Sequence, residues 1–430
     1  MRKTIAMLLA LLLVAVMLPV TAMAVEVVET AEEFENAVAA GAEITLNHDI
    51  NLTKTIVIST DGKVTIDLNG YAIKNPNGTA LILSKGALTI TGTGTVEDTN
   101  QKGAGICVRG SNNSEDSNYS VLTVDKNVTL KGIYGFFVTP YESGVQQVAY
   151  GVQINFNGKT DSAGGAYING QIQHKNNCPV INIGSSADLQ GSGVGIYAAG
   201  YGIWNIQGSI TGPTGIYSKA GIINLNGATV KGTGEKAEPV ANGNGCDSTG
   251  DAIILDSKEN YAGDMKLNVG AGTVLTSTNG YALQMANTDV ADPETNVVDL
   301  TISGGNFTGN ENLGALKFSK GFIDKANVSN TGVTAKVTGG TYNFVPETDE
   351  GAKAKGDLEA LVPENMVLDL NGNDGTVKPK NTTIVIIQPT EEKPAEDQKN
   401  PSTGANDFVG IAAAMAIVSV VGAAAVSRKK

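Results

Sequence analysis

The sequence predicts an all-β fold in which residues 42–345 form a right-handed parallel β-helix, and two recurring elements support this prediction. One element, Gly-Ile-Tyr, occurs at residues 132–134, 195–197 and 215–217. Both elements keep a step of about 20 to 23 residues, which is the length of one coil of three short strands with their turns. The other element places an asparagine between two apolar residues, at Asn155, Asn182, Asn205, Asn224 and Asn268.

Alternation within each element predicts ladders of equivalent residues along the stack of coils. In the stretch "IINLNGATV", Ile223 and Leu225 point inward, while Asn224 faces outward or stacks at a bend. The five asparagines are 27, 23, 19 and 44 residues apart, and we interpret the last spacing as two steps of 22. The repeat region therefore predicts about 12 to 14 coils. Interruptions of the rhythm at residues 100–120 and 232–251 predict loops.

Segments at both ends of the repeat region can cover its open strand edges, which a solenoid must protect. Residues 25–41 form the predicted N-terminal capping segment, with a helix that begins at a Thr30–Glu33 capping box and ends at Gly41. Residues 346–388 form the predicted C-terminal cap, with a short helix and a strand, and residues 389–399 form a charged linker that contains a proline. Three residues give the first helix an apolar face: Phe34, Ala37 and Val38.

Both ends of the chain carry features of an exported protein. Residues 1–24 combine a basic start, an apolar core and a small residue at Ala24, which predicts a secretory signal peptide cleaved after Ala24. A retained membrane anchor is the alternative. Residues 408–426 contain no charge and have roughly the length of a membrane-spanning helix. Residues 428–430 are all basic, which favours a cytoplasmic C-terminus.

The pentapeptide before the predicted span gives residues 400–430 a more specific interpretation. This tail resembles the sorting signals of Gram-positive cell-wall proteins, which combine a Leu-Pro-x-Thr-Gly motif, an apolar span and a basic tail. The resemblance implies that a sortase joins Thr403 to peptidoglycan after cleaving the bond to Gly404. Asn400 stands where the usual motif has leucine, which leaves the class of sortase open, and a plain membrane anchor is the alternative. The implied recognition residues are Asn400, Pro401, Ser402, Thr403 and Gly404.

The repeat region resembles the pectate-lyase-like superfamily of parallel β-helices, and more closely the β-helix surface proteins of Gram-positive bacteria. The stretch "TIDLNGYAI" and the elements at Ser303–Phe307 and Thr338–Tyr342 carry the second resemblance. These motifs imply a fold, and many functions share one fold.

Charge excludes one class of partner. The signal peptide carries two positive charges, and residues 404–430 carry three positive and one negative, so removing both changes the net charge of −13 to about −17. Nucleic acid binding needs clustered lysine and arginine, so we expect no nucleic acid partner.

The three cysteines are too few and too far apart to predict a disulfide framework. No Cys-x-x-Cys spacing occurs among them. We interpret Cys107, Cys178 and Cys246 as small packing residues.

An enzymatic function finds little support in the sequence. Pectate lyases of the resembled superfamily use an aspartate cluster that holds calcium and an arginine base, whereas here the aspartates are scattered and Arg109 is the only arginine between residues 25 and 403. Polygalacturonase-like hydrolases place a histidine after an Asn-Thr-Asp element. Here residues 287–289 read "NTD", but His48 and His174 both precede them. We assign no catalytic residue, and a polysaccharide lyase or glycoside hydrolase remains the alternative.

One loop raises the question of a metal ion. Asp247, Asp251 and Asp256 are close in sequence, and clustered carboxylates are the oxygen ligands that calcium prefers. A solvated acidic loop is the alternative interpretation. We therefore assign no cofactor and no metal ligand, and keep calcium as a hypothesis for this loop.

The Gly-Ile-Tyr elements suggest a ligand surface. If Ile196 and Ile216 point inward, Tyr197 and Tyr217 point outward, and Tyr134 joins them on the same face. Exposed aromatic rings can stack on sugar rings while their hydroxyls bond sugar hydroxyls. Packing of these tyrosines under a neighbouring loop is the alternative. Trp204 is expected in the core or at a corner.

These features together predict an extracellular protein attached to the cell wall. The first functional hypothesis is a non-catalytic, adhesin-like or structural rod that contacts glycans or host surface proteins. Its other expected partners are a sortase and peptidoglycan. Contact with the membrane is expected only through residues 408–426, before sorting.

Overall fold

A computed structural model describes residues 25–140, 148–240, 245–257, 263–287, 296–326, 328–329, 331–345 and 349–380. Ala24, the motif at residues 400–404 and the predicted span at residues 408–426 lie outside this part of the chain. Within it, no helix is long and apolar enough to cross a membrane. The described residues belong to one compact unit.

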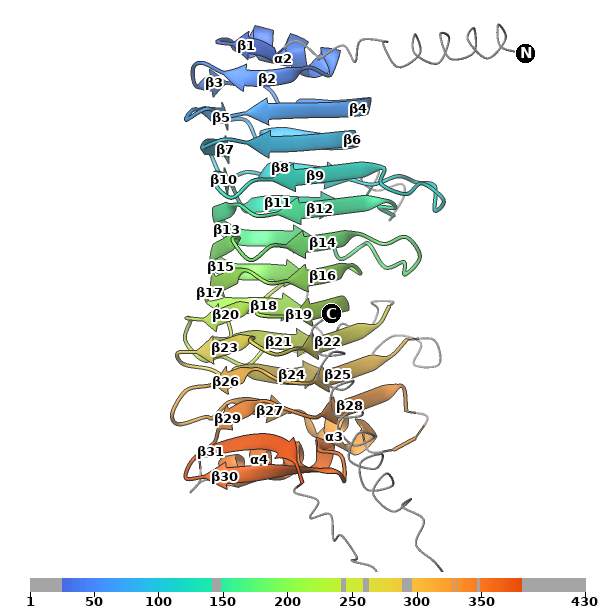
Figure 1. The fold of residues 1–430 in the computed structure, drawn as a ribbon, viewed down its shortest axis with the longest axis vertical. Helices are drawn as coiled ribbons and strands as arrows, with labels where there is room; N and C mark the ends of the chain where they lie inside the picture. Colours follow the sequence, from blue (N-terminus) through green and yellow to red (C-terminus); the bar gives the residue numbers. More distant parts are fainter. Residues whose placement is uncertain are drawn as a thin grey trace, which may run out of the picture. The chain divides into compact units, whose positions relative to one another are not determined.

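The described chain is mostly β-strand and forms a solenoid of stacked coils, as predicted (Figure 1). Strands β1 to β29 pair in parallel with strands one coil away, on three successive faces. Four long strands, β4, β6, β13 and β15, each turn a corner and contribute to two faces. Each coil visits the three faces in the same order.

The three faces comprise the following strands. The asparagine face contains β1 (Val25–Val28), β2 (Glu43–Leu46), the ends of β4 (Ile56–Asp67) and β6 (Leu81–Thr91), β9 (Ser120–Val124), β12 (Val152–Phe156), β14 (Val180–Ile183), β16 (Ile203–Ile206), β19 (Gly221–Leu225), β22 (Met265–Val269), β25 (Val298–Ile302) and β28 (Val333–Val337). The linking face contains β3 (Ile50–Asn51), β5 (Ala72–Asn75), β7 (Gly94–Asp98), β10 (Val128–Lys131), the starts of β13 (Lys159–Ile168) and β15 (Asp188–Ala198), β17 (Ser209–Gly212), β20 (Thr229–Gly232), β23 (Val274–Ser277), β26 (Asn306–Thr308) and β29 (Thr341–Asn343). The tyrosine face contains the starts of β4 and β6, β8 (Ala104–Arg109), β11 (Tyr134–Thr139), the ends of β13 and β15, β18 (Thr214–Ser218), β21 (Ile253–Asp256), β24 (Leu283–Asn287) and β27 (Leu316–Phe318).

The register of the asparagine face fixes the number of coils. Asn224 pairs directly with Asn268, so the spacing of 44 residues is one coil with an insertion, and its interpretation as two coils was wrong. Within residues 42–345 this face has eleven strands, so the prediction of 12 to 14 coils for that region was too high, and β1 before it adds a twelfth strand. One outward row passes through eleven coils: Glu43, Thr65, Thr89, Thr123, Asn155, Asn182, Asn205, Asn224, Asn268, Thr301 and Lys336.

The five asparagines of this row form the predicted ladder. Asn205 Nδ2 donates to Asn182 Oδ1 at 2.9 Å, and Asn205 Oδ1 accepts from Asn224 Nδ2 at 2.9 Å. The same bond joins Asn182 to Asn155 at 2.9 Å and Asn268 to Asn224 at 2.8 Å. The three inner amides, Asn182, Asn205 and Asn224, therefore each bond to the coil on either side, and the ladder holds the coils in register.

Replacing Asn205 with alanine should destabilise the protein by about 1 to 3 kcal/mol, since it removes two side-chain hydrogen bonds of about 0.5 to 1.5 kcal/mol each. Urea denaturation of the variant and the parent measures the difference. Asn226→Ala is the matched control, because Asn226 is exposed at the turn after β19. Equal loss of stability in both variants would contradict a contribution from the ladder.

The interior of the solenoid is filled by one apolar cluster. Phe136 and Phe156, from different faces, have ring centroids 5.2 Å apart. Trp204 on β16 is fully buried in the same cluster, which confirms its predicted place in the core. Inward residues of each strand alternate with outward ones, as the pattern of the sequence predicts.

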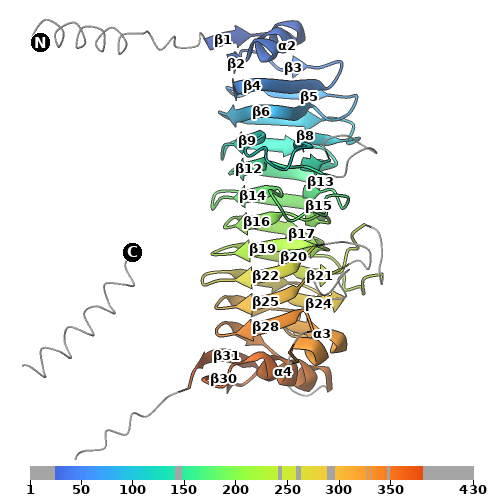
Figure 2. The same ribbon diagram turned by 90° about the vertical axis from the view of Figure 1, so that its right-hand side faces the viewer.

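Both ends of the described stack are covered (Figure 2). Helix α2 (Ala31–Ala40) starts with the predicted Thr30–Glu33 capping box and ends at Gly41, whose φ is 71°. The buried residues of this helix are Phe34, Ala37 and Val38, as predicted. At the other end lie the helices α3 (Lys320–Ala326) and α4 (Asp349–Leu361) and the hairpin of β30 (Met366–Asn371) and β31 (Asp374–Pro379), which pairs antiparallel with β29.

The two predicted loops have different outcomes. Residues 100–120 contain strand β8 and the first residue of β9, so only the turn at residues 100–103 and the loop at residues 110–119 lie outside strands and the prediction was partly wrong. The described residues between Gly232 and Ile253 contain no strand, which confirms the second loop. We call residues 233–240 and 245–252 the roof segment.

Candidate functional site

The outward side of the tyrosine face carries a continuous row of large side chains in register. Phe137 pairs with Tyr167, Tyr167 with Tyr197, and Tyr197 with Tyr217. The row continues through Ile254, Gln284 and Lys317. Outward tyrosines at Tyr197 and Tyr217 were predicted, and Ile196 and Ile216 are buried in the core beneath them.

The predicted exposure of these tyrosines was wrong. The exposed fraction is 5% for Tyr197 and 0% for Tyr217, so neither can offer a ligand surface. Tyr134 is half-buried, and its register partners are Ala104 and Gly164, which places it three residues before the tyrosine row. Phe137 and Tyr167 lie in the same row as Tyr197 and Tyr217, and neither was predicted there. The elements "GFF" at residues 135–137 and "GAY" at residues 165–167 could have revealed them.

The aromatic rings of the row also stack face to face on one another. Tyr167 stacks on Phe137 with centroids 4.9 Å apart and on Tyr197 with centroids 5.1 Å apart, and both ring pairs are within 4° of parallel. A sugar needs a free ring face to stack on, and neighbouring rings occupy the two faces of Tyr167. The row is therefore a packing device that supports successive coils.

The roof segment covers the middle of this row. Cys246 packs against a small apolar cluster that includes Tyr197, Tyr217 and Ile254. Thr214 Oγ1 donates to the carbonyl oxygen of Asp247 at 2.9 Å. The alternative interpretation, in which a neighbouring loop buries the tyrosines, thus describes the structure.

Charged groups tie the start of the roof segment to the coils. Lys236 Nζ lies 2.8 Å from Gln284 Oε1 and 3.3 Å from Asp251 Oδ2, and Lys317 Nζ lies 2.6 Å from Glu238 Oε1. Burial raises the pKa of Asp251 despite the nearby Lys236. Burial also acts to raise the pKa of Glu238, but the ion pair with Lys317 outweighs it and lowers that pKa.

The aspartates of this region do not form the calcium site considered from the sequence. Asp251 faces Lys236, and Asp256 faces Lys219 at 3.1 Å. Asp247 Oδ2 accepts from the backbone N–H of Val240 at 2.9 Å. Among the described residues, no group of three or more His, Cys, Asp or Glu side chains could hold a metal ion. Asp289 of the "NTD" element lies outside these residues.

The cysteines have no disulfide partners and sit in apolar surroundings. Cys107 and Cys178 are buried and Cys246 is half-buried, so burial was correctly predicted for the first two. Burial raises the pKa of Cys107 to about 12 and the pKa values of Cys178 and Cys246 to about 11. Thiols with such pKa values stay protonated at neutral pH and are poor nucleophiles.

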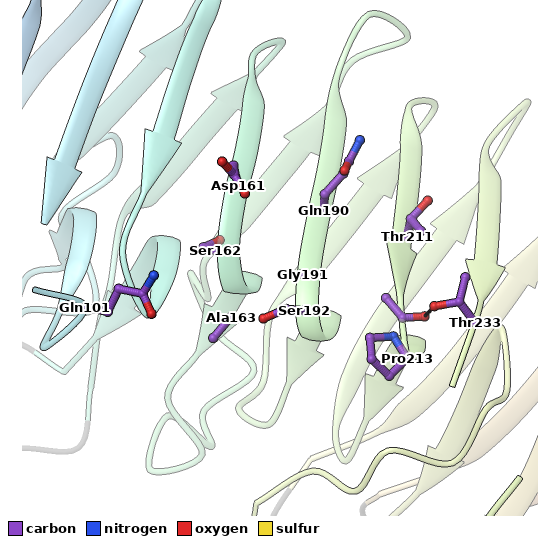
Figure 3. A pocket seen from close by; sticks show the side chains of 11 residues that line it. Gln101, Asp161, Ser162, Ala163, Gln190, Gly191, Ser192, Thr211, Pro213 and Thr233 are labelled. Atoms are coloured by element: carbon purple, nitrogen blue, oxygen red, sulfur yellow. Dashed lines mark hydrogen bonds between the residues drawn. The ribbon is translucent and has the colours of Figure 1, made fainter. Parts of the chain in front are cut away.

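Among the described residues, one candidate for a ligand site lies at the corner between the linking and tyrosine faces (Figure 3). A pocket of about 370 Å³ extends along this corner from Gln101 to Thr233. Asp161, Gln190 and Thr211 are register partners on successive coils, and Figure 3 shows their side chains one after another along the pocket. The other polar lining side chains include Ser192, and a bulge between Ser162 and Gly164 shapes the corner.

The chemistry of the pocket suits a polar, uncharged ligand. Amide and hydroxyl side chains both donate and accept hydrogen bonds, as sugar hydroxyls do. Asp161 is the one carboxylate among the described lining residues, and its Oδ2 lies 3.0 Å from Lys131 Nζ. Hydrolysis of glycosides requires two carboxyl groups about 5 to 9.5 Å apart across the sugar. The described lining thus offers hydrogen bonds but not this catalytic pair.

Comparison with protein-family models gives no match, and comparisons with curated proteins and with solved structures give none either.

Proposed function

We propose that this chain is an exported surface protein, held on the cell wall of a Gram-positive bacterium through Thr403, whose β-solenoid binds glycans without cleaving them. The observation that carries the binding role is the alignment of Asp161, Gln190 and Thr211 in one open corner pocket. The coil is proposed to be right-handed, since parallel strand crossovers have that hand in about 98% of cases.

The spacing of the pocket favours a linear glycan over a compact ligand. Neighbouring parallel strands are about 4.8 Å apart, so each coil presents its polar side chain at a regular interval along the pocket. A chain of sugar rings repeats at a similar interval and can place one hydroxyl group near each coil. The pocket volume of about 370 Å³ also falls within the usual range of ligand sites, about 300 to 1,000 Å³.

The ends of the chain support export and anchoring through their sequence alone. A signal peptide cleaved after Ala24 and the tail from Asn400 to Lys430 have the order that sortase substrates require. The proposed partners are therefore a sortase, peptidoglycan and an external glycan. The acidic net charge of −13 argues against nucleic acid.

Replacing both Gln190 and Thr211 with alanine should weaken glycan binding about 10- to 100-fold. The double variant removes at least two hydrogen bonds of about 0.5 to 1.5 kcal/mol each, and 1.4 kcal/mol corresponds to a factor of ten. A glycan array of the full chain identifies the ligand, and calorimetric titration of the strongest hit gives the affinity of each variant.

The matched control for this experiment is Thr276→Ala. Thr276 pairs with Lys231, the register partner of Thr211, so it lies in the same outward row two coils beyond Thr211 and outside the pocket. The control should bind like the parent. Unchanged affinity of the double variant for every array hit would exclude the corner pocket as the binding site.

A further inference from the structure

The hydrogen bonds inside the corner pocket determine which polar atoms it presents to a ligand. Gln190 Nε2 donates to Asp188 Oδ2 at 2.9 Å. A carboxylate accepts hydrogen bonds and donates none, so this bond directs the Nε2 end of the amide toward Asp188. The amide oxygen, Oε1, is thereby left as an acceptor for a ligand.

Two hydroxyl groups of the lining are oriented in the same way. Ser162 Oγ donates to the carbonyl oxygen of Gly164 at 2.7 Å, and Thr233 Oγ1 donates to the carbonyl oxygen of Gly212 at 3.1 Å. A hydroxyl group has a single proton, so both oxygens act as acceptors toward a ligand. The lining is therefore richer in acceptors than its composition indicates.

A negative charge lies beside these acceptors. Asp161 is the one charged side chain among the described lining residues, and it pairs in register with Gln190 on the next coil (Figure 3). Its Oδ2 lies 3.0 Å from Lys131 Nζ, and the exposed fraction is 73% for the Asp161 side chain and 37% for that of Lys131. An exposed ion pair contributes little to stability, so a ligand cation can compete with Lys131 for this carboxylate.

We propose that the glycan bound in this pocket contains a hexosamine whose amino group is not acetylated, with its ammonium placed between Asp161 and Gln190 Oε1. The inference rests on the proposed glycan binding and narrows the class of sugar. An ammonium has three protons and no lone pair, so it complements a carboxylate beside neutral acceptors. The rest of the ligand is uncharged, in agreement with the hydroxyl and amide groups that make up the other polar side chains of the described lining.

Two other classes of sugar fit the same groups less well. An N-acetylated hexosamine offers one N–H in place of three and carries no charge, so it lacks the charge attraction to Asp161. A uronic acid would bring a second carboxylate next to Asp161, and like charges brought together oppose binding. The pocket should therefore select a free amine over both.

Matched pairs of oligosaccharides test this preference on the full chain. The probes are linear oligomers of glucosamine and of galactosamine, each with free amino groups and in the N-acetylated form, at a mildly acidic pH where the amines are protonated and the carboxylates ionised. In calorimetric titrations the free-amine form of the better-bound pair should bind about 10-fold more tightly, the effect of one charge-assisted interaction, and added salt should reduce the ratio. Equal or tighter binding of the acetylated form would overturn the inference. If the array captures only glycans without a free amine, the inference fails while glycan binding stands, and capture of no glycan overturns both.

Variants separate recognition in the pocket from general attraction between a cationic oligomer and an acidic protein. Asp161→Asn removes the charge and nearly keeps the shape, and should abolish the preference for the free amine. Glu26→Gln is the matched control, because Glu26 is exposed on β1, outside the pocket, and this variant should keep the preference. Lys131→Met removes the competing ammonium and should strengthen binding of the free-amine form. Equal losses in Asp161→Asn and Glu26→Gln, or weaker binding in Lys131→Met, would contradict the assignment of the ammonium to Asp161.

Discussion

Replacing Trp204 with alanine is expected to destabilise the protein by about 3 to 5 kcal/mol, the range measured for large aromatic residues truncated in a core. Trp204 is fully buried on β16, and its register partners Ile181 and Ile223 are buried on the coils to either side. Truncation would leave a cavity that parallel coils on a fixed spacing can close only partly. Urea denaturation followed by circular dichroism measures the loss, because the chain has no other tryptophan whose fluorescence could report it.

Trp204→Phe is the matched control for that variant. The indole Nε1 is buried and has no hydrogen-bond partner among the described residues, so its removal relieves an unsatisfied donor. Phenylalanine keeps most of the ring volume, and the change in the free energy of unfolding should stay below about 1.5 kcal/mol. If alanine and phenylalanine have equal effects, cavity formation at this site does not govern the stability of the core.

Gly195→Ala should be nearly as damaging, although it adds only one methyl group. A Cβ at this position would lie 2.4 Å from the carbonyl oxygen of Gly215 and 2.6 Å from Ile210 Cγ2. The nearest obstacle is the backbone of the next coil, which cannot rotate away as a side chain can. We expect a loss of about 3 kcal/mol, the upper end of the usual range for overpacking.

Gly356→Ala controls for the general effect of replacing a glycine. Gly356 lies within helix α4, and a Cβ there would meet no atom within 4 Å. Alanine should stabilise this helix by up to about 1 kcal/mol. Thermal denaturation of both variants beside the parent gives the comparison. A tolerated Gly195→Ala would show that adjacent coils can move apart at this corner, contrary to the close contact described here.

The ladder of asparagines shows what periodicity can predict. Each asparagine stands between two apolar residues, and this pattern alone placed Asn155, Asn182 and Asn205 above one another. The fold class and helix α2 follow from equally local signals, such as alternation and a capping box. Such features depend on residues that are close in sequence, so they can be predicted from the sequence alone.

The number of coils and the place of the tyrosines depend on contacts that periodicity does not encode. A spacing of 44 residues fits two coils or one coil with an insertion, and only the direct pairing of Asn224 with Asn268 distinguishes them. That insertion includes the roof segment, which folds back and buries Tyr217. Irregular segments follow no fixed period, so their packing over a face was not predictable.

The corner pocket escaped prediction for a related reason. Asp161, Gln190 and Thr211 share no motif, and they meet because β13, β15 and β17 pair in register on the linking face where it reaches this corner. A repeated motif such as Gly-Ile-Tyr is visible in the sequence because its residues are identical, whereas residues that are only chemically similar form no visible motif. Aligning the coils by their inward residues would have brought these three positions together.

The most direct test of the account is whether the protein binds glycans and leaves them intact. We would incubate the full chain with every glycan that it captures on an array and count reducing and unsaturated ends over time. We expect capture that depends on Gln190 and Thr211, with no new ends. New ends would contradict this expectation and would point to two carboxylates. One is Asp161, and the other is Asp188, which accepts a hydrogen bond from Gln190 on the coil next to that of Asp161. Capture of no glycan at all would contradict the binding role itself.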